Sequence, residues 1–201
     1  MTTHSRISGF GFSLPERELG NEELTASSNI TDEWILTRTG IQTRRILAPG
    51  QNGSDLALAA TLSALKASGK TSTDISHILY ATCTPDAACP SAACTLANKL
   101  ELNGCMAVDL NAACTGFVYG LELADALLSR TPQACVLLVA AEALSHRCNM
   151  EDPGTAVLFG DGAGAAFCTA FEGANADSSS LFCGGIIDVS LRSDASNADL
   201  H

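Results

Sequence analysis

Cys114 is the residue whose type and setting in this sequence best suit covalent chemistry. It lies in the run Asn-Ala-Ala-Cys-Thr-Gly-Phe (residues 111–117), between an apolar, strand-like segment (106–110) and a helical pattern (115–129). The first backbone N–H groups of a helix are unpaired and lie at the positive end of its dipole, so they favour a thiolate and could hold a developing oxyanion. The small neighbours of Cys114 leave room for a substrate beside the sulfur.

The helix terminus alone does not make Cys114 a strong nucleophile. Its electrostatic effect amounts to about 0.3–1 kcal/mol, so full activation requires a cationic or basic partner, most often His. The alternative is that Cys114 is a small, buried and inert residue at a tight turn, as many free cysteines are. From position alone, both interpretations stay open.

The rest of the chain predicts a layered α/β protein that would hold this turn. Apolar, β-branched segments predict strands, and the helical patterns between them have start and stop signals. Such alternation is typical of a sheet covered by helices on both faces. The predicted strands are 7–12, 78–82, 106–110, 135–140, 165–169 and 186–191, and the predicted helices are 55–68, 91–100 and 115–129.

The predicted helix 115–129 is apolar around almost its whole circumference. Its polar stripe is one row wide and contains Glu122, Asp125 and Ser129. A helix of this kind belongs inside a protein rather than on its surface. We therefore expect a central helical layer with sheet on both sides.

Charge and cysteine content exclude several classes of function. The 201 residues include 22 acidic and 11 basic side chains, a net charge of −11, so we expect neither nucleic acid nor an anionic membrane as a partner. The longest apolar run, 134–141, is too short to span a bilayer, and the first thirty residues lack a signal-peptide pattern. These features favour a cytoplasmic protein.

The nine cysteines are not spaced as a metal or redox site. None forms a C-x-x-C pair and their number is odd, so we expect no disulfide framework and no metal centre, and we expect most of these cysteines to be small buried residues. They stand at 83, 89, 94, 105, 114, 135, 148, 168 and 183. As a separate prediction, we expect no cofactor.

Four separated runs, in order, carry a family resemblance. They are 31–41 (Thr-Asp-Glu-Trp-Ile-Leu-Thr-Arg-Thr-Gly-Ile), 90–94 (Pro-Ser-Ala-Ala-Cys), 111–117 and 159–165 (Phe-Gly-Asp-Gly-Ala-Gly-Ala). With them the chain closely resembles β-ketoacyl-acyl-carrier-protein synthase III and its relatives, condensing enzymes of the thiolase-like fold. The similarity covers essentially residues 5–195.

The resemblance implies a layered α-β-α-β-α fold of which this chain holds the first half and the opening of the second. The N-terminal half with the nucleophile would be residues 1–171, the polar stretch 172–183 would be a linker, and 184–201 would begin an incomplete second half.

The resemblance also implies roles for five residues. Cys114 matches the cysteine that the family acylates from an acyl thioester. Trp34 and Arg38 match residues of the coenzyme A channel, where an indole can stack on adenine and a guanidinium can pair with phosphate. Leu144 and Phe159 match apolar positions bordering the site. Without the resemblance, these four would be a half-buried aromatic, a surface charge and two ordinary core residues.

Two residues depart from the family pattern, and one glycine-rich run needs a separate interpretation. Cys89 stands where relatives often have Phe at the wall of the acyl pocket, so a longer or branched acyl group could enter. Pro153 replaces the Arg of an Asp-Arg-Gly-Thr run, which removes one contact to the coenzyme. The run 160–164 has the spacing G-x-G-x-G, which is not a dinucleotide fingerprint, and the resemblance implies a tight turn that supports the active site.

Two motifs of the family are absent. The His of a His-Gln-x-Asn run and the Asn of a Gly-Asn-Thr-Ser-like run, which would stabilise an enolate, do not occur, and we expect solvated or structural roles for His4, His77, His146 and His201. The resemblance thus implies a decarboxylating Claisen condensation that this chain cannot finish without a companion C-terminal segment. The implied substrates are an acyl-CoA and a malonyl thioester of CoA or of acyl-carrier protein, and the implied assembly is a homodimer formed through the strand before the nucleophile.

Two other functions fit the same residues. One is a non-catalytic or truncated partner subunit of a complete condensing enzyme, although the retained Cys114 argues against a pure scaffold. The other is a thiolase-fold acyltransferase that uses oxygen or nitrogen acceptors without decarboxylation, which the altered Cys89 and Pro153 fit equally well.

Overall fold

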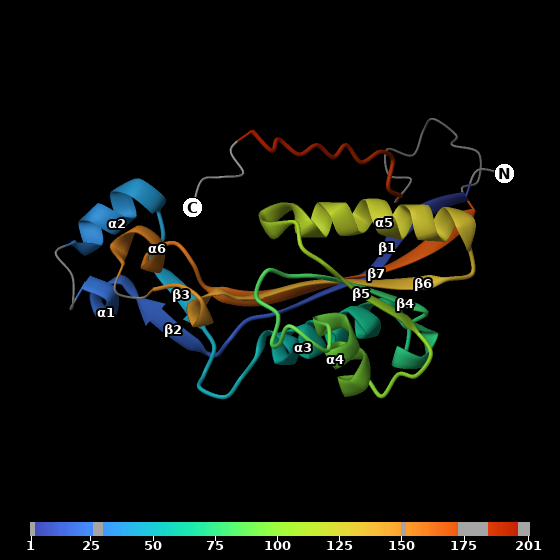
Figure 1. The fold of residues 1–201 in the computed structure, drawn as a ribbon, viewed down its shortest axis with the longest axis horizontal. Coiled ribbons are helices and arrows are strands. Elements are labelled where there is room, and N and C mark those ends of the chain that lie inside the picture. Colours follow the sequence, from blue (N-terminus) through green and yellow to red (C-terminus); the bar gives the residue numbers. More distant parts are fainter. Residues whose placement is uncertain (1–2, 26–29, 150–151, 173–184, 197–201) are drawn as a thin grey trace.

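The centre of the molecule is a sheet of five strands in the order β1-β7-β6-β4-β5 (Figure 1). The computed structural model describes residues 3–25, 30–149, 152–172 and 185–196. Strand β4 runs parallel to β5 and β6, whereas β7 is antiparallel to β6 and to β1. The strands are β1 (Thr3–Ser13), β4 (His77–Ala81), β5 (Met106–Leu110), β6 (Cys135–Ala143) and β7 (Asp161–Glu172).

Helices cover both faces of this sheet, as the sequence predicted. Figure 1 shows α3 (Gly53–Ser68) and α4 (Ala92–Lys99) on one face and α5 (Gly116–Arg130) on the other. Side chains alternate along each strand, so Tyr80 packs toward α3 and α4 whereas Leu79 packs toward α5. We call the sheet and these three helices the sheet body.

Local signals explain where the helices begin and end. Helix α3 starts with a capping box in which Asn52 N–H donates to Asp55 Oδ2 (2.9 Å), and it ends at Gly69 with φ of 68°. Helix α4 begins directly after Ser91, its N-cap, whose hydroxyl accepts a hydrogen bond from Cys94 N (3.1 Å). A 3-10 helix, η1 (Ser72–Asp74), precedes β4.

A second, smaller region lies at one end of the sheet (Figure 1). It is built on the antiparallel pair β2 (Arg17–Gly20) and β3 (Thr43–Ile46) and on α1 (Asn21–Thr25), α2 (Asp32–Thr39) and α6 (Pro153–Ala156). We call these five elements the small lobe. None was predicted from the sequence, because each is short and has no long apolar period.

Five of the six predicted strands form, but the segment 186–191 does not. Within the described residues 185–196 there is no strand, and the segment makes one backbone hydrogen bond to the sheet, from Ile186 N to Ser5 O (2.7 Å). A strand needs a continuous ladder with a neighbour, which one bond does not provide. The predicted linker 172–183 lies outside the described residues apart from Glu172, the last residue of β7.

Helix α5 is buried on one face only, so the expectation of sheet on both sides is wrong for the described chain. Gly116, Gly120 and Ala124 face the sheet, whereas Val118 and Leu123 are 42% and 40% exposed. Segment 185–196 runs over the outer face (Figure 1), and Tyr119 Oη and Ser193 Oγ are 2.7 Å apart. The apolar outer face explains why the sequence pattern indicated a buried helix.

Among the described residues, no helix combines the length and the apolar composition needed to cross a membrane.

Candidate active site

Cys114 is exposed and lies in the turn between β5 and α5. It is the middle residue of the 3-10 helix η2 (Ala113–Thr115), and the residue before it, Ala113, has φ of 44°. A non-glycine residue in this left-handed region costs about 1 kcal/mol or more. The neighbouring strands are in register, with Ala81 beside Leu110, so Cys114 lies at the carboxyl edge of the sheet. The exposed position removes the alternative of a merely buried residue.

Close packing of α5 on the sheet fixes the backbone of this turn. A Cβ on Gly116 would come 3.0 Å from the Cβ of Ala81, and one on Gly120 would overlap the side chain of Leu138. Both glycines therefore let the first turns of α5 lie directly on β4 and β6. The amides that follow Cys114 are held in place by this contact.

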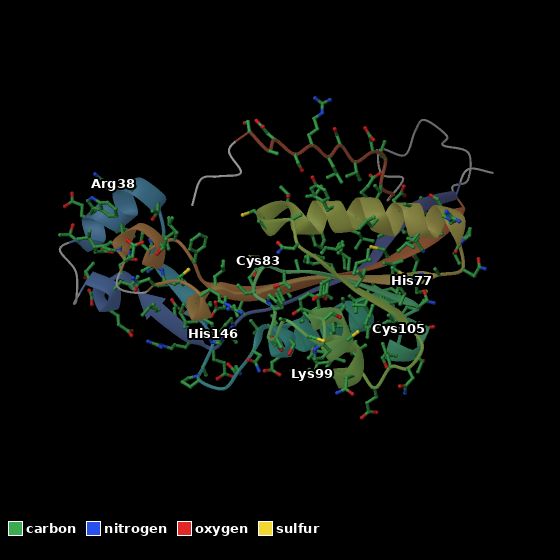
Figure 2. The ribbon with its side chains drawn as sticks, in the orientation of Figure 1. Arg38, His77, Cys83, Lys99, Cys105 and His146 are labelled. Carbon is green, nitrogen blue, oxygen red and sulfur yellow. The ribbon has the colours of Figure 1, made fainter. Side chains whose placement is uncertain are left out.

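A second cysteine lies close to the nucleophile candidate. Cys83 follows β4, and its backbone N–H and its thiol donate to the Glu142 carboxylate at 2.8 Å and 3.4 Å. The Thr84 hydroxyl donates to the same carboxylate at 2.5 Å, so Glu142, near the end of β6, holds the loop after β4. Figure 2 shows Cys83 at this edge of the sheet.

The environment of Cys83 disfavours its thiolate. Partial desolvation raises the pKa of the Cys83 thiol, and the hydrogen bond and charge of Glu142 raise it further. Negative charge on the Cys114 sulfur raises the pKa of Cys83 as well. Sequence reasoning missed Cys83 and Glu142. Cys83 directly follows the predicted strand 78–82, which pairs with the strand that leads to Cys114, and Glu142 lies two residues beyond the predicted strand 135–140.

A groove of about 590 Å³ adjoins the nucleophile turn. It lies between the end of β5, the outer face of α5 and residues 192–194. Cys114 does not line it, but Ala112 and Thr115 on either side of the cysteine do. The nucleophile turn therefore lies at the rim of an open groove.

Neither of the two histidines with described side chains is hydrogen-bonded to Cys114. His77 starts β4, whose five residues span about 13 Å, so it lies at the opposite edge of the sheet from Cys114. Its Nδ1 is 2.8 Å from Ser76 Oγ. His146 ends the 3-10 helix η3 (Leu144–His146) and is exposed at the base of the small lobe (Figure 2).

Trp34 and Arg38 come together on α2 in the small lobe. The Arg38 guanidinium lies over the indole, 4.4 Å from the ring centroid, with Trp34 half-buried and Arg38 exposed. The helix is capped by Thr31, whose hydroxyl accepts from Trp34 N, and it ends at Gly40 with φ of 71°. Figure 2 shows that Arg38 lies far from Cys83, so these two predicted site residues belong to another region than the nucleophile turn.

Leu144 and Phe159 lie on two segments joined by Asp161. The buried Asp161 carboxylate accepts hydrogen bonds from Ser145 N (2.9 Å), Ser145 Oγ (2.5 Å) and Leu47 N (2.8 Å). Leu144 is half-buried and Phe159 is 37% exposed. Asp161 thus fixes both segments against the end of β3.

The run 160–164 is not the tight turn that the resemblance implied. From Asp161 onward it is the start of β7, where Gly162 pairs with Glu142 and Gly164 pairs with Ala140 and Phe12. Strands on both sides accept and donate its backbone hydrogen bonds, so the small residues extend rather than turn.

The two departures from the family pattern are found at exposed or helix-starting positions. Cys89 is exposed and lies two residues before Ser91, the residue that caps α4. Pro153 is the first residue of α6, after Asp152, whose side chain accepts from Gly154 N (2.9 Å).

Most described cysteines are not buried, contrary to the expectation from the sequence. Cys168 alone among the eight described is buried, and burial raises its pKa to about 12. Four are exposed because they lie in loops at the carboxyl edge of the sheet or on the outer side of α4: Cys83, Cys89, Cys94 and Cys114. All eight are free, and the described residues contain no cluster of three or more His, Cys, Asp and Glu side chains suited to a metal ion.

Comparison with known proteins agrees with the motifs around Cys114. The family described as 3-Oxoacyl-[acyl-carrier-protein (ACP)] synthase III matches residues 108–194. A beta-ketoacyl-[acyl-carrier-protein] synthase III of Nitratidesulfovibrio vulgaris (strain DP4) is 55% identical over 170 residues, which cover 85% of this chain and 52% of the relative. This chain is similar to the synthase III family over 85% of its own length. It spans about half the length of the relatives that it matches.

Solved structures confirm the predicted thiolase-like fold class. The 3-oxoacyl-[acyl-carrier-protein] synthase III from Aquifex aeolicus VF5 has a TM-score of 0.79 and 40% identity, covering 84% of this chain and 54% of that one. The priming β-ketosynthase of the R1128 polyketide biosynthetic pathway has a TM-score of 0.80 and 34% identity, covering 84% and 50%. The synthase III-like chain thus has a partial thiolase-like fold of three layers.

Proposed function

We propose that this synthase III-like chain accepts an acyl group on Cys114 from a coenzyme A thioester, as the first stage of a decarboxylating condensation. The observation that carries the proposal is the exposed Cys114 in the turn before α5, at the carboxyl edge of the sheet. Thr115 leaves the first amides of α5 without a side-chain cap, because its hydroxyl donates to Ala112 O (2.8 Å) instead. These amides would hold the oxyanion that forms when the thioester carbonyl is attacked.

The acyl transfer is a thioester exchange. The Cys114 sulfur attacks the thioester carbonyl, a new carbon–sulfur bond forms, and the coenzyme A sulfur leaves and takes up the proton lost by Cys114. The product is acyl-Cys114 and free coenzyme A.

The small lobe would bind the coenzyme A part of the donor. Trp34 offers an aromatic surface for adenine, and Arg38, exposed beside it, offers a guanidinium for phosphate. Leu144 and Phe159 would border the acyl end, and the small, exposed Cys89 would leave room for an acyl group longer than acetyl.

The second stage would need groups that this sequence does not contain. A malonyl thioester loses CO₂, and its enolate attacks acyl-Cys114, forming a carbon–carbon bond and releasing the Cys114 thiolate with a 3-oxoacyl thioester. Donors must stabilise the enolate oxygen, and we propose that a companion C-terminal segment supplies them as His and Asn. Strand β5 has one neighbour in the described sheet, β4, so its other edge is open to pairing in a homodimer.

Intact-mass analysis after incubation with an acyl-CoA tests the first stage. We expect a single acyl adduct on the wild-type chain, no adduct on Cys114→Ala, and a retained adduct on Cys83→Ala, the control for the neighbouring thiol. An equal adduct on Cys114→Ala would refute the assignment of the nucleophile. No adduct on the wild type even with the companion segment would favour a non-catalytic subunit, and normal turnover of a malonyl thioester by this chain alone would refute the need for that segment.

A further inference from the structure

Arg44 is a buried cation at the centre of the small lobe. It lies on β3, is 5% exposed, and donates from Nη1 to Asn21 Oδ1 (2.7 Å) and from Nη2 to Val157 O (2.7 Å). Its Nε has no hydrogen-bond partner in the described part of the chain. Both acceptors are neutral, and burial lowers the pKa of Arg44.

Asn21 extends the link from Arg44 to α2. The buried Asn21 amide donates to Asp32 Oδ1 (2.6 Å) and to Ile41 O (2.9 Å). Asp32 is the first residue of α2, and Trp34 follows two residues later. The guanidinium is thus connected through one amide to the carboxylate at the start of the helix that carries Trp34 and Arg38.

The other end of the link reaches the connection between α6 and β7. Val157 lies two residues before Phe159. A Cβ on Gly160 would be 3.1 Å from both the Arg44 Cβ and the Arg45 carbonyl oxygen, so this connection packs directly on β3 at Arg44. The packing at Gly160 and the hydrogen bond to Val157 O therefore both join the connection between α6 and β7 to β3 at Arg44.

We propose that Arg44 is a positioning residue that holds α2, with Trp34 and Arg38, at a fixed place relative to the segment that carries Phe159. The proposal rests on the proposed function, in which these two segments are the walls of the thioester channel. A buried cation between neutral acceptors is costly to desolvate, and an apolar side chain of similar volume would avoid that cost. Stability alone does not account for an arginine here, whereas a need to join two segments through a rigid two-pronged donor does.

Arg45 provides a matched control on the same strand. Its side chain is 41% exposed, forms an ion pair with Glu18 (2.9 Å), and donates to Glu16 O (3.1 Å). It has the same charge and lies one residue away, but these side-chain bonds are directed to the stretch 15–18, outside α2 and the segment before β7.

Trp34 fluorescence tests the proposal, because Trp34 is the one tryptophan of the sequence. In the 201-residue chain without ligand, we expect Arg44→Gln to increase acrylamide quenching of Trp34 and amide exchange over 32–39 and 153–159. In a titration with coenzyme A, we expect the Kd of Arg44→Gln to be roughly tenfold or more above that of the wild type, because the substitution removes two buried hydrogen bonds. Arg45→Gln should change Kd less than about twofold, as surface ion pairs do. Arg44→Lys should fall between them, because an ammonium lacks the planar fork.

The proposal is overturned if folded Arg44→Gln matches the wild type in quenching, exchange and affinity for coenzyme A. Should Arg44→Gln fail to fold, Asn21→Ala gives the same test, because it removes the link to Asp32 and leaves the bond from Arg44 to Val157; unchanged quenching and exchange in that variant also overturn the proposal. A wild-type chain that binds no coenzyme A refutes the proposed function of the lobe, and the two measurements without ligand still decide the role of Arg44.

Discussion

The sheet body and the small lobe are stabilised by different interactions. In the sheet body, two apolar clusters fill the space on either side of the sheet, and strand residues such as Leu137 and Leu138 are fully buried. The small lobe buries fewer apolar side chains, such as Leu19 and Ile35, and it also contains the buried polar bonds of Arg44 and Asn21. Apolar packing holds a backbone turn such as that of Cys114 rigidly, whereas a buried polar network fixes the relative position of short segments that share only a small apolar core.

The proposed chemistry is divided in the same way. The nucleophile candidate is on the sheet body, and the residues proposed to bind coenzyme A are on the small lobe. Asp161 joins the two regions, because its carboxylate binds the end of β3 and the turn after β6. The following substitutions test this division, beginning with the largest expected effect.

Phe167→Ala tests the role of apolar packing in the sheet body. Phe167 is fully buried in the cluster under α3 and α4, so we expect its truncation to lower the free energy of unfolding by about 3–5 kcal/mol. Phe12, on β1 and 67% exposed, is the control, and Phe12→Ala should cost less than about 1 kcal/mol. Urea denaturation followed by circular dichroism measures both, and equal losses would contradict the assignment of the core.

Asp161→Ala tests the join between the two regions. The substitution leaves two backbone N–H groups and one hydroxyl without their acceptor, so we expect the free energy of unfolding to fall by about 2–3 kcal/mol. Trp34 fluorescence should then change at a lower urea concentration than the circular dichroism of the sheet body. Asp152→Ala, which removes an exposed helix cap, should cost about 1 kcal/mol. Coincident transitions in Asp161→Ala would show that this carboxylate does not couple the lobe to the body.

Gly120→Ala tests the close contact of α5 with the sheet. Because the new methyl group would overlap the buried Leu138 side chain, we expect the free energy of unfolding to fall by about 1–2 kcal/mol. Gly20, in β2 of the lobe, has open space around it, and Gly20→Ala should be neutral or stabilising by up to about 1 kcal/mol. Thermal unfolding of the pair measures the difference. A stable Gly120→Ala protein would show that α5 does not need this approach.

Lys99→Met tests a surface ion pair of the sheet body and its pH dependence. Burial raises the pKa of Asp55, but the hydrogen bond from Lys99 (2.5 Å) and that from Asn52 N–H lower it more, so the net shift is downward. A depressed folded-state pKa stabilises the fold above the unfolded pKa, and this stabilisation is lost as pH falls through the folded value.

The effect is small, because the Asp55 side chain is 44% exposed and the pair is screened by solvent. We expect Lys99→Met to cost about 0.5 kcal/mol near pH 7 and less near pH 2. Lys66→Met, at an exposed lysine of α3 with no ion pair in the described part of the chain, should show no such pH dependence. A cost that stays constant down to low pH would contradict the role of the Asp55 charge.

The comparison of the two regions also explains what could be predicted from the sequence. The continuous apolar strands and the capped helices of the sheet body were predictable, because their burial repeats with a regular period. The small lobe was not, because its elements are short and its central buried residue, Arg44, is of a type that is seldom buried.

The candidate site shows the same limit. Cys114, Trp34 and Arg38 were identified from motifs, and the structure adds that Trp34 and Arg38 stack on each other. Glu142 and Cys83 were missed because spacing along a strand does not show which side chains meet across strand ends. The segment 186–191 has a strand-like composition, yet a strand also requires a neighbour to pair with.

Peptide mapping of the acylated chain tests the division of labour most directly. The protein is incubated with an acyl-CoA, with and without excess free coenzyme A, and the acyl group is located among the four exposed cysteines, Cys83, Cys89, Cys94 and Cys114. We predict acylation of Cys114 that free coenzyme A slows and that Trp34→Ala slows as well. Acylation spread over all four cysteines at rates that neither change affects would contradict the division between nucleophile turn and coenzyme-binding lobe.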